Sequence, residues 1–431
     1  MFFLYNGLLL LPRLACGPVG LWATYSDGES AQEWAGRLGR VPGSTGPRAI
    51  WIQAASVGET RVAAALLRSF PKGLSPTYLS ATTRAGCRLA RSLEAEFGGT
   101  LATGTFPLDF RASVRATLDV LRPRVLVLVE TEVWPNLLDA CAATGVRTLI
   151  VNGRISPRAF ARYRLAPRLT RRCLGLVGRI CAQSEADAQR FIALGSPRER
   201  VEVAGNIKYD TPPPPSREAA SEFRAGVGVP ADAPLFVAGS TAEGEDALVL
   251  DAFTILRRAR PALRLLLAPR HARRFDEAAH EATRRGFRVG RRSEPAAPGE
   301  APEVIILDTL GELPLAWAAA QAAFVGGSLV PRGGQNMIEP ASCGLPPVFG
   351  PGVENFREPA DRLLGAGAAF VVNDPRELAA AIGALLDDPA RSRSLGEIAR
   401  LTVAAASGAT ARCREAIEAS LRAGAFRKGA A

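Results

Sequence analysis

Short apolar runs alternate with stretches of helical periodicity along most of the chain. In the first half the apolar runs lie at residues 49–54, 77–80, 125–130, 147–151 and 176–182. Between them, apolar side chains recur at helical spacing over 59–69 and 84–97. The run VLVLVE at 125–130 is rich in valine, which is typical of a strand covered by helices on both faces. Strand, helix and strand in succession predict parallel pairing with right-handed crossovers, and therefore a doubly wound α/β sheet.

The alternation stops at TPPPPS, residues 211–216, and then restarts. Consecutive prolines cannot continue a strand or a helix and behave as a stiff spacer, so we expect the domain boundary there. Apolar runs then recur at residues 235–238, 263–267, 304–307, 322–325, 347–349 and 369–372. The predicted organisation is an apolar segment at 1–22, a domain at 23–210, the linker at 211–216, a second domain at 217–389 and a helical region at 390–431.

Length and composition agree with two domains and limit the chemistry. A chain of 431 residues suggests two domains of about 200 residues each, and a hydrophobic content of 47% is ample for two cores. The seven cysteines are scattered without a Cys-x-x-Cys pair, which indicates buried free thiols in a reducing compartment. Only two histidines occur, His271 and His280, so a histidine-based metal site or a Ser-His-Asp triad is nearly excluded.

The net charge of +11 is unevenly distributed. Residues 1–210 contain 27 Lys+Arg and 16 Asp+Glu, whereas residues 211–431 contain 26 of each, so the whole excess lies in the first half. A basic domain suits a polyanionic partner, such as nucleic acid, an anionic membrane surface or a phosphorylated lipid. The alternative is a solvated arginine-rich surface without a specific partner.

The N-terminal segment, MFFLYNGLLLLPRLACGPVGLW, is apolar but interrupted by Asn-Gly, Pro-Arg and Gly-Pro pairs. Its longest clean run is too short to span a bilayer, which needs about 20 residues, and it lacks the basic start of a secretory signal. Its phenylalanines and leucines could instead lay an apolar face into one leaflet. A buried first helix is the alternative.

Carboxylates follow two predicted core strands of the first domain. Glu59 opens a helix just past the first strand, and Glu130 and Glu132 follow the VLVLV run. Ligands of open α/β sheets bind outside the carboxyl ends of the strands, so all three residues are candidates for a site. Glu59 has a second interpretation, because Ser56 with Glu three residues later is a capping box. The two later glutamates could instead pair with Arg154.

Glycines cluster in the second domain, in FVGGSLVPRGGQNMIEP at 324–340. Glycine lets the backbone approach a ligand closely, and a helix N-terminus offers free N–H groups to a phosphate. Two Gly pairs followed by Asn336, Glu339 and then Asn355 favour a nucleotide-sugar pocket over an ordinary glycine-rich loop.

Three further features suit a phosphate-bearing ligand. Ser240 and Thr241 follow the first strand of the second domain in a turn of small residues, and Arg270 follows the next strand with a permanently charged guanidinium. Lys208 lies near the domain boundary, where a surface salt bridge is its alternative role. No Asp-x-Asp pair marks a divalent-ion site, so we expect backbone N–H groups and basic side chains to stabilise the phosphate charge.

Nine sequence blocks, in order along the chain, resemble the bacterial 3-deoxy-D-manno-octulosonic acid (Kdo) transferases, which are GT-B glycosyltransferases. The blocks are WIQAASVGET (51–60), ETEVWPN (130–136), NGRIS (152–156), AQSEADAQRF (182–191), GNIKYD (205–210), GSTAEGED (239–246), APRH (268–271), DTLGEL (308–313) and the segment 324–358. The chain departs from the family pattern at Ala242, Arg332 and Gln335, positions where the family often has histidine.

The resemblance implies two Rossmann-like doubly wound domains facing a cleft, with a C-terminal helix that crosses back to the first domain. It implies transfer of Kdo, with inversion, from CMP-Kdo to a lipid A precursor in lipopolysaccharide biosynthesis. Glu59 matches the general base of the family. An essential acid of the family lies in the motif of Glu130 and Glu132, and we favour Glu132.

The resemblance also implies the remaining site residues and partners. The acceptor side is expected to include Ser56, Gly58 and Arg154. The donor side is expected to comprise Lys208, Ser240, Thr241, Arg270, Gly311, Glu312, Gly327, Ser328, Asn336, Glu339 and Asn355. We expect CMP-Kdo, a lipid A precursor and an anionic membrane surface as partners, without nucleic acid, a metal ion or a cofactor. The expected location is the cytoplasmic face of the inner membrane.

Two alternatives of different kinds stay open from the sequence. One is another GT-B glycosyltransferase that uses a UDP-sugar, and the other is a membrane-surface anion-binding protein with a degenerate pocket. The intact glutamates of the first domain speak against degeneracy, whereas the three departures from the family pattern speak mildly for it. Binding of CMP alone would support the Kdo transferase, binding of UDP alone the other glycosyltransferase, and binding of neither the anion-binding protein.

Overall fold

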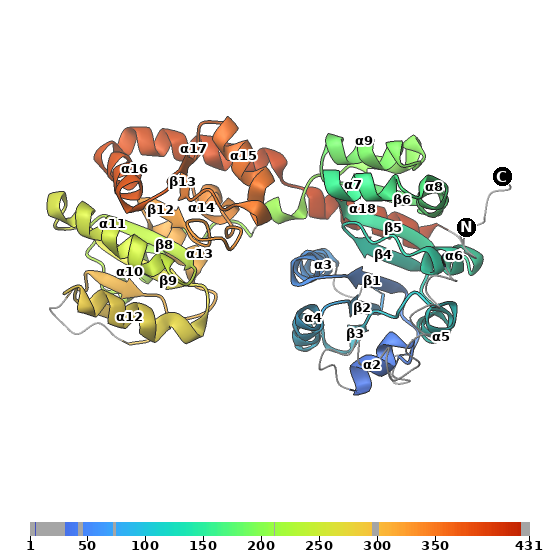
Figure 1. Ribbon diagram of the computed structural model, residues 1–431. Helices are drawn as coiled ribbons and strands as arrows, with labels where there is room; N and C mark the ends of the chain where they lie inside the picture. The colour runs from blue at the N-terminus through green and yellow to red at the C-terminus, as the bar shows by residue number, and fades with distance from the viewer. Residues whose placement is uncertain are drawn as a thin grey trace. The chain divides into compact units, whose positions relative to one another are not determined.

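The computed structural model describes residues 5, 31–41, 46–71, 75–210, 212–294 and 301–423. The chain forms two compact units, of which unit 1 comprises Met1–Asp210 and Ser407–Ala431, and unit 2 comprises Thr211–Ala406. Each unit is built around one seven-stranded sheet (Figure 1). The expected apolar segment at 1–22 lies outside the described residues except for Tyr5, whose hydroxyl donates to Asp109 Oδ2 at 2.9 Å.

Unit 1 contains a parallel sheet with the strand order β3-β2-β1-β4-β5-β6-β7. Its strands are β1 (Ile50–Ala54), β2 (Thr77–Ala81), β3 (Leu101–Thr105), β4 (Val125–Val129), β5 (Arg147–Gly153), β6 (Arg179–Ala182) and β7 (Val201–Val203). Its α-helices are α2 (Ala31–Arg37), α3 (Val57–Ser69), α4 (Arg84–Phe97), α5 (Arg111–Leu121), α6 (Pro135–Ala143), α7 (Pro157–Tyr163), α8 (Pro167–Gly175), α9 (Glu185–Ala193) and α18 (Ala409–Arg422). The order reverses between β1 and β4, and ligands of open α/β sheets bind at such a switch point, outside the carboxyl ends of the strands.

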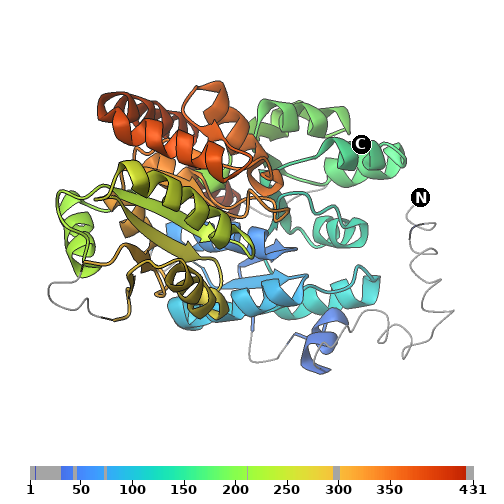
Figure 2. The same cartoon turned by 60° about the vertical axis from the view of Figure 1, so that its left-hand side comes forward.

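Unit 2 repeats this architecture with the strand order β10-β11-β9-β8-β12-β13-β14, again all parallel. Its strands are β8 (Leu235–Thr241), β9 (Arg264–Pro269), β10 (Val289–Arg291), β11 (Val304–Ile306), β12 (Ala322–Val325), β13 (Pro347–Phe349) and β14 (Phe370–Val371). Its α-helices are α10 (Arg217–Gly226), α11 (Glu245–Ala259), α12 (Phe275–Arg284), α13 (Leu313–Ala319), α14 (Ile338–Ser342), α15 (Arg357–Gly365), α16 (Pro375–Asp387) and α17 (Pro389–Ala406). Figure 2 brings unit 2 forward and shows helices on both faces of its sheet, whose switch point lies between β8 and β12.

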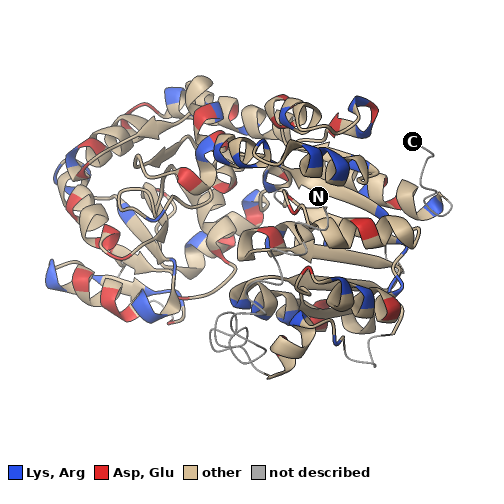
Figure 3. Cartoon of the chain, turned by 45° about the vertical axis from the view of Figure 1, so that its right-hand side comes forward, with Lys and Arg blue, Asp and Glu red and all other residues tan. Residues whose placement is uncertain are grey.

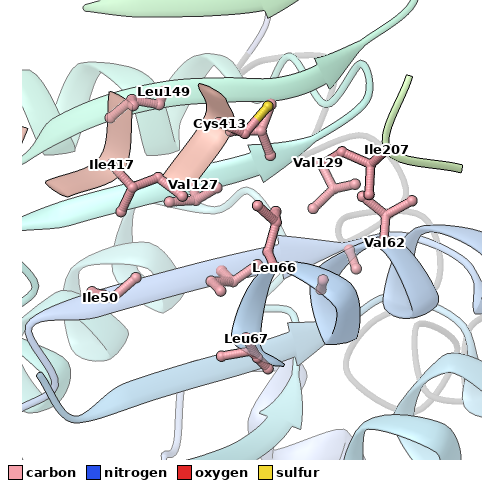
Figure 4. Packing of buried hydrophobic residues seen from close by; sticks show 14 of the residues in the cluster. Ile50, Val62, Leu66, Leu67, Val127, Val129, Leu149, Ile207, Cys413 and Ile417 are labelled. Atoms are coloured by element: carbon pink, nitrogen blue, oxygen red, sulfur yellow. The ribbon is translucent and has the colours of Figure 1, made fainter. Parts of the chain in front are cut away.

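Strand β4 illustrates how the sequence pattern produces the core of unit 1. All five residues of VLVLV have 0% exposure. The three valines pack into a cluster with α3 and α18, and the two leucines pack into a second cluster on the opposite face of the sheet. Figure 4 shows the first cluster, in which Leu66 of α3 and Ile417 of α18 point toward Val127. The continuous apolar run therefore belongs to a strand covered on both faces, as predicted.

The C-terminal helical region expected at 390–431 consists of two helices with different partners. Helix α17 stays with unit 2, where a Cβ added at Gly396 would lie 1.8 Å from the carbonyl oxygen of Gly344. Only the chain from Ser407 onward returns to unit 1, where α18 joins the cluster that contains α3. The crossing helix is confirmed, but the expectation that the whole region packs back was too broad. The small residues of α17 fit it closely to α14 instead.

Hydrogen bonds fasten the returning chain to unit 1. Asp210 accepts the N–H groups of Gly408 and Thr410, and the hydroxyl of Ser407 donates to the Tyr209 carbonyl at 3.1 Å. Arg412 Nε donates to the Ala204 carbonyl at 2.7 Å. The start of α18 is therefore held by the segment that ends the first half of unit 1.

Three strands of the structure were not predicted from the sequence, namely β3, β7 and β10. All three lie at sheet edges, and most of their residues are half-buried or exposed. An edge strand pairs on one side only and lacks the continuous apolar run of a central strand, so its pattern is weak. Across the described ranges, no helix combines the length and the apolar character required to cross a membrane.

Candidate active site

Glu59 lies at the carboxyl end of β1, in the first turn of α3. Ser56 is the N-cap of this helix, and its Oγ accepts the N–H of Glu59 at 3.3 Å. In return, the carboxylate of Glu59 accepts the N–H of Ala55 at 2.6 Å and the hydroxyl of Ser56 at 3.1 Å. The capping interpretation of the motif is thus correct, and the same bonds fix the carboxylate in one orientation. Neighbouring Gly58 is exposed.

The environment of Glu59 suits proton transfer near neutral pH. Burial, together with the charges of Glu130 and Glu132, raises its pKa to about 7, and the hydrogen bonds from Ala55 and Ser56 oppose this shift. A carboxylate with a pKa near the working pH can accept a proton and release it again. The carboxylates of Glu130 and Glu132, after β4, therefore raise the pKa of Glu59, after β1. The two strands are neighbours at the switch point, which brings their carboxyl ends together.

Glu130 follows β4 directly and has a left-handed backbone conformation with φ of 61°. Its N–H donates to the Val151 carbonyl at 2.9 Å, which holds this unfavourable geometry in place. Burial raises its pKa, whereas the positive charges of Lys208 and Arg154 lower it. Arg154 makes no ion pair with Glu130 or Glu132 within the described part of the chain, so it acts on Glu130 through its charge alone. Lys208, expected on the donor side, lies in unit 1 beside Glu130.

Glu132 is held more rigidly than Glu130. Its Oε2 accepts the indole N–H of Trp134 at 2.7 Å and the amide of Gln53 at 3.4 Å. Gln53 is fully buried on β1 and accepts the hydroxyl of Ser80 at 2.6 Å, while the Trp134 ring packs against Phe106 at 5.2 Å. Burial raises the pKa of Glu132 against these hydrogen bonds. Both partners fix the carboxylate close to the end of β1.

Asn152 is a candidate site residue that the sequence reasoning did not select. It is fully buried at the end of β5, and its φ of 52° places it in the left-handed region. Its Oδ1 accepts the N–H of Ile207 at 2.9 Å, which positions the turn that carries Lys208. Its Nδ2 has no partner among the described residues. Asparagine tolerates this conformation, and an Asn-Gly pair at the end of a strand was the available signal.

The switch point of unit 2 brings together the end of β8 and the small-residue turn that follows β12. Ser240 and Thr241, expected in a turn after the first strand, are the last two residues of β8. Ser240 has a left-handed φ of 56°, and Thr241 is fully buried. A Cβ added at Gly326 would lie 2.5 Å from the Cα of Thr241, so only glycine allows the two strand ends to approach this closely. Gly327 has a φ of 68° and continues the turn.

Ser328 lies inside this turn with 1% exposure. Its hydroxyl donates to the Val325 carbonyl at 2.6 Å and accepts the N–H of Gly350 at 2.8 Å. Its own N–H and those of Gly327 and Leu329 donate to the carboxylate of Glu245. Ser328 therefore stabilises the loop itself. The N–H groups of the glycine turn bind Glu245, a residue that the sequence reasoning did not select.

Asn336 and Glu339, predicted in the β12 loop, interact with each other, whereas Asn355, which follows β13, reaches back to this loop. Asn336 donates from Nδ2 to Glu339 at 3.0 Å and accepts the N–H of Ile338 at 3.1 Å, which closes the start of α14. Asn355 donates to the Arg332 carbonyl at 3.2 Å, and a Cβ at Gly333 would lie 2.4 Å from its Nδ2. The second Gly pair thus permits the close approach of Asn355.

The remaining predicted donor residues lie on other strand ends. Arg270 is exposed after β9, next to β8, and its N–H donates to the Thr241 carbonyl at 2.9 Å. Gly311 and Glu312 follow β11, which is separated from β8 by β9. Glu312 pairs with Arg292 at 2.8 Å, and the hydrogen bond from this guanidinium lowers the pKa of its carboxyl. Strand order therefore places Arg270 beside the switch point and the Gly311–Glu312 pair further away.

Basic residues gather after the end of β5. Residues 154–172 contain seven arginines and no acidic residue, and all seven are exposed: Arg154, Arg158, Arg162, Arg164, Arg168, Arg171 and Arg172. Leu165, in the connection between α7 and α8, is 84% exposed. Figure 3 shows Lys and Arg in blue along α7 and α8. Within the described ranges, no group of three or more His, Cys, Asp or Glu residues is arranged to hold a metal ion.

Comparisons with known proteins agree with this architecture. Residues 32–211 match the family model described as 3-deoxy-D-manno-octulosonic-acid transferase (kdotransferase). The chain is 36% identical over 375 residues to the 3-deoxy-D-manno-octulosonic acid transferase of Bordetella pertussis, covering 86% of each chain. It is 32% identical over 407 residues to the enzyme of that name from Haemophilus influenzae, covering 91% of this chain and 92% of the relative. A crystal structure of Anabaena HepE in complex with UDP has a similar fold, with a TM-score of 0.56 and 17% identity over 86% of this chain and 99% of that one.

Two parallel sheets, each flanked by helices, with a terminal helix returning to the first unit, define the two-domain α/β architecture of the GT-B fold. The sequence identities narrow the class further. The chain belongs to the 3-deoxy-D-manno-octulosonic acid (Kdo) transferase family. The resemblance found in the sequence blocks is confirmed, and family membership assigns the enzyme to lipopolysaccharide biosynthesis.

Proposed function

We propose that this enzyme transfers Kdo from CMP-Kdo to a lipid A precursor with inversion, and that Glu59 is the general base. The observation that carries the proposal is the carboxylate of Glu59 at the switch point of unit 1, with a pKa raised to about 7 beside Glu130 and Glu132. Family membership supplies the transferred sugar, and the titration range of Glu59 suits the proton transfer.

In the proposed reaction, Glu59 takes the proton of an acceptor hydroxyl as its oxygen attacks the anomeric carbon of Kdo. The bond from that carbon to the CMP phosphate breaks on the opposite face, so the configuration inverts and CMP leaves with the bonding electrons. Trp134 and Gln53 fix the carboxyl group of Glu132 close to the base. Lys208 and Arg154 balance the negative charge around Glu130.

The leaving phosphate needs positive partners in unit 2. Arg270 is exposed beside the switch point and carries a permanent charge, so we propose it as a phosphate ligand. The N–H groups of Gly327, Ser328 and Leu329 already donate to Glu245. The donor phosphate must therefore bind to basic side chains and to other atoms of the loops. We propose Asn336, Glu339 and Asn355 as the polar groups on the nucleoside side of this loop.

The acceptor in this proposal is an anionic lipid at the cytoplasmic face of the inner membrane. The excess charge of +11 in residues 1–210 and the exposed arginines of 154–172 support it, since both favour a phosphorylated partner. Ser56, Gly58 and Arg154 adjoin Glu59 or Glu130 and would contact the acceptor sugar.

Replacement of the base tests the proposal directly. Glu59→Gln keeps the size of the side chain but removes the proton acceptor, so turnover should fall by about 10² to 10⁴. CMP affinity, measured by calorimetry, should stay nearly unchanged, and UDP should not bind to either protein. Glu199→Gln, at an exposed position, is the matched control and should retain full turnover. Retention of more than about a tenth of the turnover by Glu59→Gln would remove Glu59 from the role of base.

A further inference from the structure

Glu245 is the first residue of α11 and has 0% exposure. Its Oε1 accepts the N–H of Ser328 at 2.9 Å and that of Leu329 at 2.8 Å. Its Oε2 accepts the N–H of Ala242 at 2.8 Å and that of Gly327. A carboxylate has about four acceptor positions, so these four backbone donors fill it.

The three successive amides of Gly327, Ser328 and Leu329 form a concave set of donors. Such sets bind phosphates and other anions in many proteins. Here a carboxylate of the protein itself occupies the anion position, and it comes from the opposite side of the switch point between β8 and β12. Glu245 therefore joins the turn after β8 to the turn after β12 by four hydrogen bonds.

A buried ion pair next to Glu245 stabilises the start of α11. Asp246 forms an ion pair with Arg274, and both side chains are almost completely buried, with 5% and 6% exposure. The hydroxyl of Thr241 donates to Asp246, and Arg274 Nη1 donates to the Thr241 carbonyl at 3.4 Å. Burial raises the pKa of Asp246, while its bonds to Thr241 and Arg274 oppose the shift. The adjacent Glu245 is consequently fixed in position as well as in orientation.

We propose that Glu245 is a positioning residue for the sugar-nucleotide site. Its carboxylate holds the segment after β8, at Ala242, and the turn at 326–329 in the geometry that binds the donor, and it controls donor affinity without touching the donor. The inference rests on the proposed use of CMP-Kdo. It assigns the glycine-turn amides to an internal anion, so the donor phosphate binds through groups other than these amides.

The chemistry of the side chain is specific. Glutamine has the same length, but its amide nitrogen cannot accept, so it would leave two of the four backbone donors unpaired in a buried site. Aspartate is shorter by one methylene group and does not reach both turns. Alanine leaves a cavity lined by four N–H groups, into which a small carboxylate such as formate would fit.

Chemical rescue provides the test. Glu245→Ala should lower CMP affinity by about tenfold or more, and added formate should restore most of it, because formate supplies the missing acceptor atoms. Glu245→Gln should lose similar affinity without rescue, since its side chain fills the cavity. Glu222→Ala, at an exposed position on α10, is the control and should bind CMP as the wild type does. Steady-state kinetics should show a raised KM for the donor and an unchanged KM for the acceptor.

Two outcomes would overturn the inference: unchanged CMP affinity in a folded Glu245→Ala protein, or lost affinity that formate does not restore. If Glu245→Ala does not fold, Glu245→Gln decides through the kinetics, and equal changes of both KM values, or no change in either, contradict the positioning role. A wild-type protein that binds no CMP would instead refute the proposed function. The two failures are therefore distinguishable.

Discussion

At the scale of single residues, Glu59 receives hydrogen bonds from Ala55 and Ser56 while burial and two neighbouring carboxylates raise its pKa to about 7. Only the ionised carboxylate can take a proton from the acceptor. Turnover should therefore increase as pH rises through about 7 and then level off. A pH–rate profile measured at saturating donor checks this. A profile that is flat from roughly pH 5.5 to 8, the range that spans this pKa, would contradict the assignment.

The same raised pKa has a consequence for stability. A carboxyl with a folded pKa of about 7, against 4.5 in the unfolded chain, stabilises the fold below pH 4.5, and this contribution is lost as pH rises through 7. Glu59→Gln should therefore be more stable than the wild type at pH 8, by about 1–2 kcal/mol after allowance for solvent screening. The gain should vanish near pH 4. Urea unfolding at both pH values measures it, and an equal effect of Glu59→Gln at the two pH values would be inconsistent with this account.

At the scale of elements, helix α6 depends on a carboxylate from a distant loop. Its N-cap, Trp134, makes no side-chain cap, and Asp109 instead accepts the N–H groups of Asn136 at 3.0 Å and Leu137 at 2.9 Å. Asp109 is 4% exposed, and burial raises its pKa to about 6 against these hydrogen bonds. The cap fixes the start of α6 at Pro135, three residues after Glu132, and therefore also stabilises the turn that follows β4.

Loss of this cap should destabilise unit 1. Asp109→Ala leaves two buried N–H groups without an acceptor, which should lower the free energy of unfolding by about 1–3 kcal/mol. Asp119→Ala is the control, because Asp119 is exposed and forms an ion pair with Arg115 at 3.0 Å on the surface of α5. Its effect should stay below about 1 kcal/mol. Equal unfolding midpoints of the two variants in urea would show that Asp109 does not act as a cap.

At the scale of the whole molecule, charge is segregated along the chain. The excess of +11 lies in residues 1–210, and the exposed arginines of 154–172 have no acidic neighbour in sequence. Each basic group close to an anionic surface contributes about 1 kcal/mol within a Debye length, so association with lipid should depend on salt. The apolar N-terminal segment would add a contribution that salt does not screen.

Vesicle sedimentation tests these two contributions separately. Full-length protein should bind anionic vesicles more strongly than neutral ones, and high salt should weaken the binding without abolishing it. A protein lacking residues 1–16 should keep only the salt-sensitive part. Absence of binding to both vesicle types would mean that the N-terminal segment and the basic surface serve another purpose.

Much of the architecture could be predicted because its physical causes are local in sequence. Continuous apolar runs such as VLVLV predicted central strands, alternation with helices predicted parallel sheets, and consecutive prolines predicted the boundary near residue 211. Polar residues after those strands then indicated which strand ends carry a candidate site, because ligands of open α/β sheets bind outside the carboxyl ends of the strands.

Other features were decided by tertiary structure alone. The edge strands β3, β7 and β10 have weak patterns because each pairs on one side only. The tail divides between the units because Gly396 fits α17 against Gly344, a contact that periodicity does not reveal. Glu245 and Asn152 acquire their roles from backbone groups that are distant in sequence. Glu245 binds the N–H of Ser328, 83 residues away, and Asn152 binds the N–H of Ile207, 55 residues away. The sequence determined which strand ends carry chemistry, and folding determined which of their polar atoms remain available, because hydrogen bonds between distant segments form only when the sheets assemble.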